Sequence, residues 1–378
     1  MNSDVLIIGG GVIGLSIARE LRRAGVRRVT VVDRGEVGRE ASYAAAGMLA
    51  PNAEAEEIDE FYHLCVESNG MYPALADSLL EETGVDIELD CSGTLYAAFT
   101  EEDSAELHER LQRRRRAGID VTLLSAGETR EAEPFISTSV RESLLFPDDR
   151  QVENRKLLAA LRRYAELNDI DVVEFAGAER VLTEGGRVVG ALVNGEQIYA
   201  DITVIATGAW TSFIQIGDVP APVDVKPIRG QMLCFQSAER PLRRVIYSPR
   251  GYLVPRADGR ILAGATVEDV GFDASVTEKG RQSIREAAIE MAPGLADIDV
   301  VESWAGLRPF AADGKPVIGA FPGVDKLFIA TGHFRNGILL APVTANILAE
   351  KIVNRRDSEY LRVFGPQRFA GAAIAGNC

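Results

Sequence analysis

The first 33 residues of the chain carry one complete strand–helix–strand pattern. Residues 5–8 form a short apolar run, which is typical of a buried parallel strand, and three glycines follow it. Apolar residues then recur with helical spacing over residues 12–24, and Gly25 closes that segment as a cap. Residues 29–33 form a second, β-branched run that ends in an acid. The pattern predicts a βαβ unit.

The turn of this unit fits the dinucleotide-binding fingerprint G-x-G-x-x-G. Gly9 allows the tight turn, Gly11 lets the backbone approach a pyrophosphate, and Gly14 lets the helix pack closely on the strand. The helix N-terminus adds free N–H groups and a partial positive charge. Asp33, about 20 residues beyond the last glycine, is placed to accept hydrogen bonds from ribose hydroxyls and to repel a 2′-phosphate. This argues against NADP.

A structural glycine turn is the alternative to a nucleotide site, but the complete context of the motif argues against it. Only one strong fingerprint is present, so we expect one bound dinucleotide. The fingerprint by itself leaves open whether that dinucleotide is NAD or FAD.

Helical patterns recur later in the chain, at residues 101–117, 157–167, 277–291 and 338–352. The first of these segments is highly charged and predicts an exposed helix. Its four consecutive arginines, residues 113–116, are expected on a solvated face rather than in a binding patch.

Strand patterns dominate the centre of the chain. Asn194-Gly195 is a strong hairpin signal between residues 188–193 and 197–200. The stretch 229–266 is rich in strands and predicts an antiparallel sheet, unlike the parallel start. The further predicted strands are residues 202–207 (ending at Gly208), 231–235, 251–255, 261–266 and 326–330.

Four more motifs are GREASYAAAGML (38–49), IATGAW (205–210), WAGLRP (304–309) and GHFRNGI (332–338). In this order they resemble the D-amino acid oxidase family, and more closely its bacterial glycine oxidase branch, which is linked to thiamine biosynthesis. The resemblance covers nearly the whole chain, and the last two motifs are specific.

The resemblance implies FAD as the dinucleotide and a mixed α/β fold. A Rossmann-type FAD-binding domain of glutathione-reductase type is expected to be discontinuous, built from residues 1–85, 145–222 and 300–378. Residues 86–144 and 223–299 are expected to form a second, substrate-binding domain on an antiparallel sheet. This agrees with the strand-rich stretch read from the pattern alone.

The resemblance also indicates which residues contact FAD. The small residues 44–47 suit a backbone that lies against a flat ring, with a helix packing contact as the alternative. The loop 332–337 precedes a helix, whose N–H groups and dipole would stabilise reduced flavin, with a plain glycine-bounded turn as the alternative. The expected cofactor contacts are Gly9, Gly11, Val12, Ile13, Gly14, Asp33, Arg34, Ala41, Ser42, Ala46, Gly47, Met48, Glu179, Gly208, His333, Phe334, Arg335, Asn336, Gly337, Ile338 and Leu339.

Some members of the family attach FAD covalently through a cysteine in the C-terminal half, near the flavin. No cysteine lies between Cys234 and Cys378 in this chain. We therefore expect FAD to be bound without a covalent link. We assign no proton-transfer role to His333.

Three residues are expected to hold the substrate. Arg308 resembles the family's carboxylate-binding arginine, whose planar fork makes two parallel bonds to a carboxylate. Tyr252 resembles the tyrosine that donates a further bond to the same group. Arg335 corresponds to a position near the substrate amine, where its backbone carbonyl is the expected contact. The structural alternatives are a salt bridge for Arg308 and a core tyrosine with a satisfied hydroxyl for Tyr252.

The function implied by the resemblance is FAD-dependent oxidative deamination of glycine, with O2 reduced to hydrogen peroxide and the imine supplied to thiazole synthesis. Val267 stands where a bulkier thioether can occur, so the choice among glycine, sarcosine and small D-amino acids stays open. One alternative is an amino acid dehydrogenase of the same fold that passes electrons to a quinone. Another is a flavin-binding assembly subunit without turnover.

Composition limits the partners of the chain. The formal net charge of −15 disfavours nucleic acid and anionic membranes, both of which need a basic face. The four cysteines and three histidines lack metal-ligand spacing, so no metal is expected. No signal-peptide layout or bilayer-spanning run is seen, which favours a cytoplasmic, bacterial-like protein. The resemblance implies a homotetramer.

Overall fold

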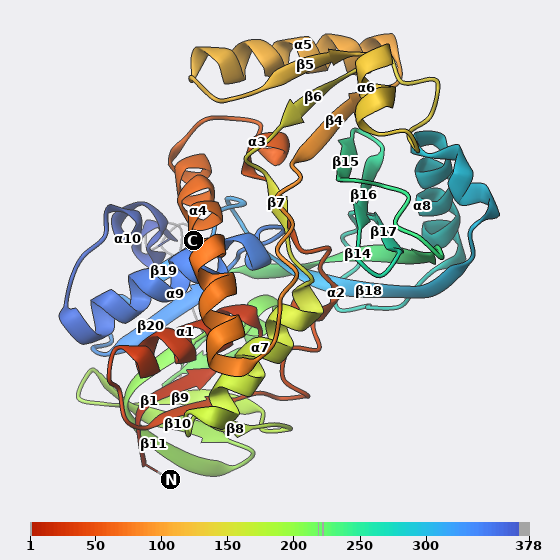
Figure 1. Cartoon of the computed structure of the whole chain (residues 1–378). Helices are drawn as coiled ribbons and strands as arrows, with labels where there is room; N and C mark the ends of the chain where they lie inside the picture. The colour runs from red at the N-terminus through yellow and green to blue at the C-terminus, as the bar shows by residue number, and fades with distance from the viewer. Residues whose placement is uncertain (1, 218, 221–222, 370–378) are drawn as a thin grey trace, which may run out of the picture.

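The structure is a computed structural model that describes residues 2–217, 219–220 and 223–369. It consists of a lower and an upper body, each built around one large sheet, and the chain crosses between them several times (Figure 1). Helices cover both bodies. The predicted mixed α/β fold class is confirmed. Cys378 lies outside the described residues.

The lower sheet has ten strands among the described residues. β1 (Asn2–Ile8) pairs in parallel with β2 (Val29–Val32) on one side and with β11 (Glu196–Ile205) on the other. Residues 5–8 and 29–32 are buried on both faces, as the continuous apolar runs predict. The other strands are β8 (Asp171–Val173), β9 (Ala178–Glu184), β10 (Arg187–Val193), β12 (Gln215–Ile216), β13 (Val219–Pro220), β19 (Val317–Ala320) and β20 (Leu327–Thr331).

Four helices pack together in the lower body, and they come from distant parts of the chain (Figure 1). They are α1 (Val12–Arg23), α4 (Glu60–Thr83), α7 (Asn154–Leu167) and α9 (Gly337–Asn354). Among the described residues, α9 is the one helix long and apolar enough to cross a membrane, and 61% of it is buried inside the protein. It packs against α1 and α4, so its apolar residues belong to the core.

The upper sheet has eight strands among the described residues, in the order β18-β14-β17-β16-β15-β4-β6-β5. Every pair is antiparallel except β4 with β15. Three helices accompany it: α5 (Glu101–Arg116), α6 (Ala126–Ala132) and α8 (Glu278–Met291). The strands are β4 (Thr94–Ala98), β5 (Thr122–Ser125), β6 (Glu142–Phe146), β14 (Val225–Gln236), β15 (Val245–Ser248), β16 (Gly251–Pro255), β17 (Arg260–Gly264) and β18 (Val300–Ala311).

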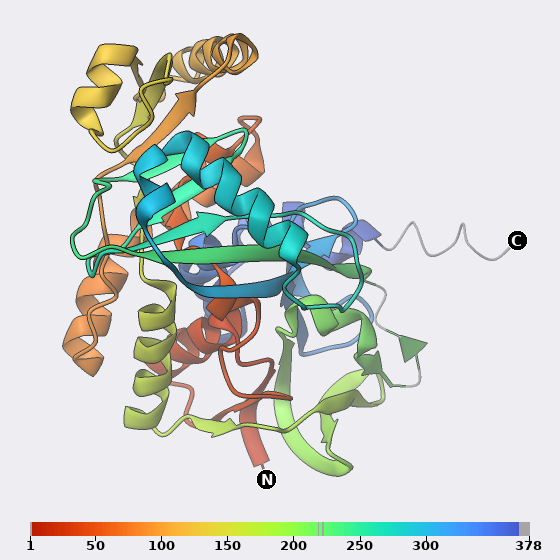
Figure 2. The same ribbon diagram turned by 90° about the vertical axis from the view of Figure 1, so that its right-hand side faces the viewer.

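The strands β14 and β18 form a long antiparallel pair that crosses the molecule between its two bodies (Figure 2). The pairing runs from Val225 opposite Ala311 to Phe235 opposite Val300. Residues 300–311 were predicted as part of the FAD-binding domain; they form β18 and pair with β14 in the upper sheet. The domain boundaries remain a prediction.

Some elements differ from the sequence-based expectation. Residues 197–200 and 202–207 were expected as two strands, but a single strand, β11, runs unbroken from Glu196 to Ile205. The pattern did not predict α4, whose sequence is interrupted by Gly70 and Pro73. The short elements that complete the fold are α2 (Ala41–Ala44), β3 (Met48–Leu49), α3 (Pro51–Glu54), β7 (Arg150–Gln151), α10 (Glu359–Phe364) and the 3-10 helices Gly208–Phe213, Pro293–Asp297 and Pro366–Phe369.

The arginine run of α5 was expected on a solvated face, but not all four arginines are solvated. Arg114 is fully buried, and its Nε donates to the carbonyl of Asn52 at 3.1 Å. Helical spacing explains this, because Arg114 shares a face with the buried residues Leu107 and Arg110. The neighbouring arginines 113, 115 and 116 are exposed.

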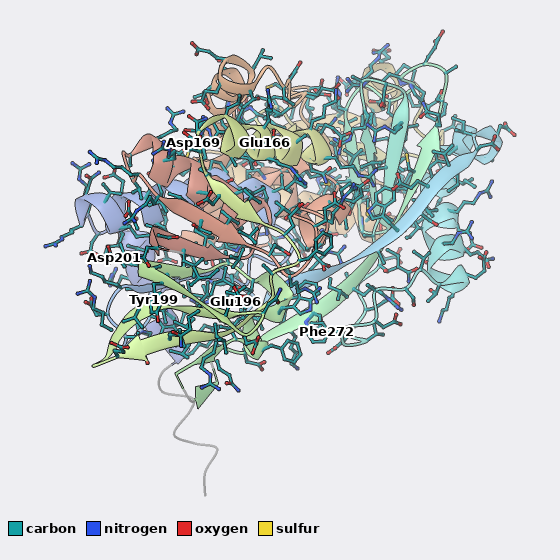
Figure 3. All side chains as sticks on the ribbon, turned by 90° about the horizontal axis from the view of Figure 1, so that it is seen from below. Glu166, Asp169, Glu196, Tyr199, Asp201 and Phe272 are labelled. Atoms are coloured by element: carbon teal, nitrogen blue, oxygen red, sulfur yellow. The ribbon has the colours of Figure 1, made fainter. Side chains whose placement is uncertain are left out.

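The underside of the lower body carries exposed acidic side chains, in keeping with the net negative charge. Figure 3 labels Glu196 and Asp201 on β11, and Glu166 and Asp169 at the end of α7. Tyr199 lies between the two β11 acids and is 48% exposed.

Candidate active site

A cavity of about 480 Å³ lies between the two sheets and is lined by residues of both. It begins at the end of β1 and reaches β14 and β18. The predicted site residues that line it are Gly9, Gly11, Val12, Ile13, Asp33, Arg34, Ala41, Ser42, Ala46, Gly47, Met48, Glu179, Gly208, Tyr252, Arg308, His333, Phe334, Arg335, Gly337 and Ile338. Residues far apart in the sequence therefore meet in one place.

Three predicted residues do not line the cavity. Gly14 lies beneath the turn, where a Cβ would stand 1.9 Å from the carbonyl oxygen of Gly9. Asn336 is the residue preceding α9, and Leu339 is 2% exposed in the core of the lower body. These three support the walls of the cavity rather than facing it.

The glycine turn has the geometry that a nucleotide site needs. Gly9 has a φ of 108°, and a Cβ there would lie 2.3 Å from the carbonyl oxygen of Ala206. Helix α1 starts directly after Gly11, so its first N–H groups face the cavity. The Val12 N–H donates to Ser42 Oγ at 3.0 Å, which places Ser42 at this helix terminus.

The Asp33 carboxylate is fixed at the end of β2 by two backbone donors. Oδ2 accepts from the Gly10 N–H at 2.7 Å, and Oδ1 accepts from the Gly35 N–H at 2.9 Å. A carboxylate has about four acceptor positions, so each oxygen keeps capacity for a ribose hydroxyl.

The segment 44–47 is held by a buried arginine that the sequence gave no reason to single out. Arg256 Nη2 donates to the Ala46 carbonyl at 2.8 Å, and Nη1 donates to the Val152 carbonyl at 2.9 Å. Gly47 has a φ of 69°, and a Cβ there would lie 2.0 Å from the Val152 oxygen. The backbone at this wall is therefore tightly fixed.

The loop before α9 is tied to the end of β18. The Phe334 N–H donates to the Pro309 carbonyl at 2.9 Å, and Phe310 forms an isolated β-bridge with His333. His333 is 3% exposed, and its Nε2 lies 3.1 Å from Thr344 Oγ1. Burial lowers the pKa of His333 to about 3, so its ring is neutral near pH 7.

Arg308 reaches the cavity from β18. Its Nη1 donates to the carbonyl oxygens of Thr266 at 3.0 Å and of Arg229 at 3.4 Å. Burial lowers the pKa of Arg308, but a guanidinium remains charged. No carboxylate of the described residues forms an ion pair with it, so the structural alternative of a salt bridge finds no support there.

Tyr252 of β16 lines the same part of the cavity and is 9% exposed. Its hydroxyl donates to Met232 Sδ at 3.2 Å, and its ring stacks on Tyr247 with the centroids 6.4 Å apart. A thioether is a weak acceptor, so the hydroxyl keeps the capacity to bind a stronger one. Val267, considered above as a pocket residue, is instead 63% exposed and does not line the cavity.

Arg335 follows the buried loop and lies opposite an acid. Its Nη2 donates to the Tyr247 hydroxyl at 3.0 Å and lies 3.8 Å from Glu54 Oε2. The Glu54 carboxylate raises the pKa of Arg335. Glu54 also lines the cavity, but no sequence motif marked it.

Comparison with known proteins settles the family. The profile of the family described as FAD dependent oxidoreductase (DAO) matches residues 4–351. The chain belongs to this family. FAD is therefore the dinucleotide of this oxidoreductase, and the choice between NAD and FAD that the fingerprint left open is resolved.

Curated relatives of this FAD dependent oxidoreductase include two proteins named glycine oxidase. The one from Pseudomonas aeruginosa is 36% identical, over 94% of this chain and 96% of its own length. The one from Bacillus subtilis is 32% identical, with 96% of each chain covered. A protein of Synechocystis named "Bifunctional protein ThiO/ThiG" is 35% identical, and the chain spans only 54% of its length.

Among solved structures, glycine oxidase from Geobacillus kaustophilus superposes with a TM-score of 0.90 and 32% identity. The match covers 96% of this chain and 98% of that one. The fold of the oxidoreductase is thus that of an experimentally determined relative.

The residues present fit FAD. The Gly9–Ala206 approach leaves no room for a side chain at the turn, and the N-terminal ends of α1 and α9 both lie on the cavity. The lining residues that were not among the predicted site residues include Trp210, Met232 and Gly230. Trp210 stacks under the Arg34 guanidinium at 3.6 Å and contacts Phe272, which Figure 3 labels. The sequence signal that could have identified Trp210 is an aromatic residue that follows the end of a strand.

Proposed function

We propose that this FAD dependent oxidoreductase is an oxidase of glycine and other small amines. The substrate loses a hydride from Cα and a proton from nitrogen, and O2 takes up two electrons and two protons to become hydrogen peroxide. The imine product then hydrolyses in water or is consumed by a partner enzyme. The names of the relatives and the character of the cavity both support this assignment.

The observation that carries the proposal is the position of Arg308. A partly buried guanidinium that has no ionic partner among the described residues faces the same cavity as the nucleotide turn. Burying a charge without a partner is costly, so such a group is retained where a ligand supplies the missing charge. A substrate carboxylate fits, because it accepts two parallel bonds from a guanidinium.

Arg308 and Tyr252 are assigned to the substrate carboxylate, and the Arg335 backbone carbonyl to the amine. The predicted cofactor residues that line the cavity are assigned to FAD. When bound, FAD supplies the hydride acceptor and the route of electrons to oxygen. The protein supplies position, and His333, which is neutral near pH 7, is assigned no role in proton transfer.

The test is an anaerobic screen of flavin reduction with glycine, sarcosine, D-alanine and D-proline. Rapid bleaching by one or more of these amines is the expected result. If none of these amines bleaches the flavin, the remaining hypothesis is the non-catalytic flavin-binding subunit. Oxygen consumption and peroxide formation then separate the oxidase from a dehydrogenase, which would need a quinone.

We further propose that the imine feeds thiazole synthesis. The bifunctional ThiO/ThiG relatives support this, although the chain spans about half their length. A cytoplasmic location and a homotetramer are proposed with it. Light scattering after size-exclusion chromatography tests the tetramer.

A further inference from the structure

Two of the arginines that line the cavity, Arg308 and Arg335, lie in its substrate region, and only Arg335 has an ion-pair partner among the described residues. Arg308 donates to two backbone carbonyls and forms no ion pair with a carboxylate of the described residues. Arg335 faces Glu54, which lines the same cavity, and the Glu54 carboxylate is the largest influence on the pKa of Arg335. The substrate region therefore presents two positive charges and one negative charge.

Glu54 is not a mobile surface acid. It ends the short helix α3, and its side chain is 17% exposed. The segment just before it is bound by the buried carboxylate of Asp149, which accepts from the Asn52 N–H at 3.0 Å and the Ala53 N–H at 3.0 Å.

Two buried arginines of α5 bind the same segment from the upper body. Arg110 Nη1 donates to the carbonyls of Ala53 at 2.8 Å and Ala55 at 2.9 Å. Arg114 also donates to the Ala55 carbonyl. The carbonyls on both sides of Glu54 are thus fixed, and so is the origin of its side chain.

We propose that Glu54 restricts this enzyme to amines with a single carboxylate. It neutralises Arg335, so that a second anionic group on the substrate meets a carboxylate instead of a free guanidinium. A like-charge contact of this kind in a partly desolvated site disfavours the wrong ligand strongly. This inference rests on the proposed function, since it concerns the choice of amine.

The test compares two N-substituted glycines that differ by one carboxylate: sarcosine and iminodiacetate. In Glu54→Gln the ratio of kcat/KM for iminodiacetate to that for sarcosine is expected to rise roughly tenfold or more, because the Arg335 guanidinium is left without its counter-charge and can attract the second carboxylate. Glu56→Gln is the matched control, because Glu56 is exposed, lies outside the cavity and carries the same charge. It should leave the ratio unchanged.

The double variant Glu54→Gln/Arg335→Gln shows whether the gain depends on Arg335. It should lose the gain, because the uncovered guanidinium is then absent. A ratio that stays at the wild-type value in a folded Glu54→Gln protein, or a gain that persists in the double variant, would overturn the inference.

Binding provides a readout that needs no turnover. Calorimetric titration of the holoenzyme with acetate and malonate should show malonate gaining affinity relative to acetate in Glu54→Gln only. If the enzyme oxidises none of the amines, the proposed function is wrong. If the relative affinities for acetate and malonate are unchanged, the Glu54 inference is wrong. The two failures are thus distinguishable.

Discussion

Gly230 on β14 leaves the space that the guanidinium of Arg308 on β18 occupies. A Cβ on Gly230 would lie 2.2 Å from both Nη1 and Nη2 of Arg308. The two strands are paired so that Gly230 is opposite Gly306, two residues before Arg308. The position of the proposed substrate anchor therefore depends on the absence of a side chain on the neighbouring strand.

Gly230→Ala is expected to displace Arg308 and to lower kcat/KM for glycine. Overpacking costs about 1–3 kcal/mol, which corresponds to roughly fivefold to a hundredfold or more. FAD content should not change. Gly70→Ala is the control, because a Cβ there meets nothing within 4 Å. Wild-type kinetics in Gly230→Ala would show that glycine does not depend on the placement of Arg308.

Arg308→Ala should leave a bound carboxylate without its charge partner, at a cost of about 2–5 kcal/mol in substrate binding. Arg308→Lys should recover only part of this, because lysine cannot form the bidentate fork. The measurement is kcat/KM for glycine against methylamine, a primary amine without the carboxylate. If Arg308→Ala keeps the full preference for glycine, the anchor lies elsewhere, with Arg335 as the next candidate.

Asp33→Ala is expected to weaken FAD binding tenfold to a hundredfold, since hydrogen bonds to a charged acceptor are typically worth roughly 1.5–3 kcal/mol. Fluorescence titration of the apoprotein with FAD measures this. Because Asp33 also accepts two backbone N–H bonds, the thermal midpoint of the apoprotein is needed as a control. Unchanged FAD affinity would remove Asp33 from the cofactor site.

Acid or heat denaturation should release FAD from the protein as the intact molecule. The three cysteines of the described residues are free, and the chain has no cysteine between Cys234 and Cys378. After precipitation the yellow colour should be in the supernatant, with the chromatographic retention of FAD. Colour that stays with the pellet would indicate a covalent link.

His333 is expected to make the protein sensitive to acid. Its folded pKa of about 3 lies below its ordinary value of 6.5, so the unfolded chain binds a proton that the folded chain does not. This contribution to stability is complete above about pH 6.5 and is lost as the pH falls toward 3. At pH 5 the loss is roughly 2 kcal/mol relative to pH 7.

The measurement compares thermal midpoints of wild type and His333→Gln at pH 7 and pH 5. The variant should lose less stability between the two values than the wild type, because glutamine does not titrate. Equal losses would show that His333 is protonated as readily in the folded protein as in the unfolded chain.

The sequence predicted the parts of this molecule whose signals are local. The βαβ unit, the Asn194-Gly195 hairpin and the antiparallel centre follow from periodicity and turn chemistry, and all three are present. Most of the predicted site residues line the cavity. The pairing of residues 300–311 with β14 could not be predicted, because strand pairing is a long-range property.

Residues whose role depends on distant partners escaped prediction. Glu54 has no motif, and only folding brings it to Arg335. Arg114 was misplaced because a run of arginines conceals which member faces the core. Gly230 looked like any strand glycine, since the residue that needs its space lies on another strand.

The connection between β18 and the loop before α9 limits how the enzyme can move. Backbone contacts join Pro309 to Phe334 and Phe310 to His333. The strand that carries Arg308 is therefore bound to the loop that faces the cofactor. A hinge that opened the two bodies would have to break these contacts. Substrate and product are therefore expected to enter and leave through an opening that is always present. Side-chain motion, rather than a hinge motion of the two bodies, is expected to control their passage.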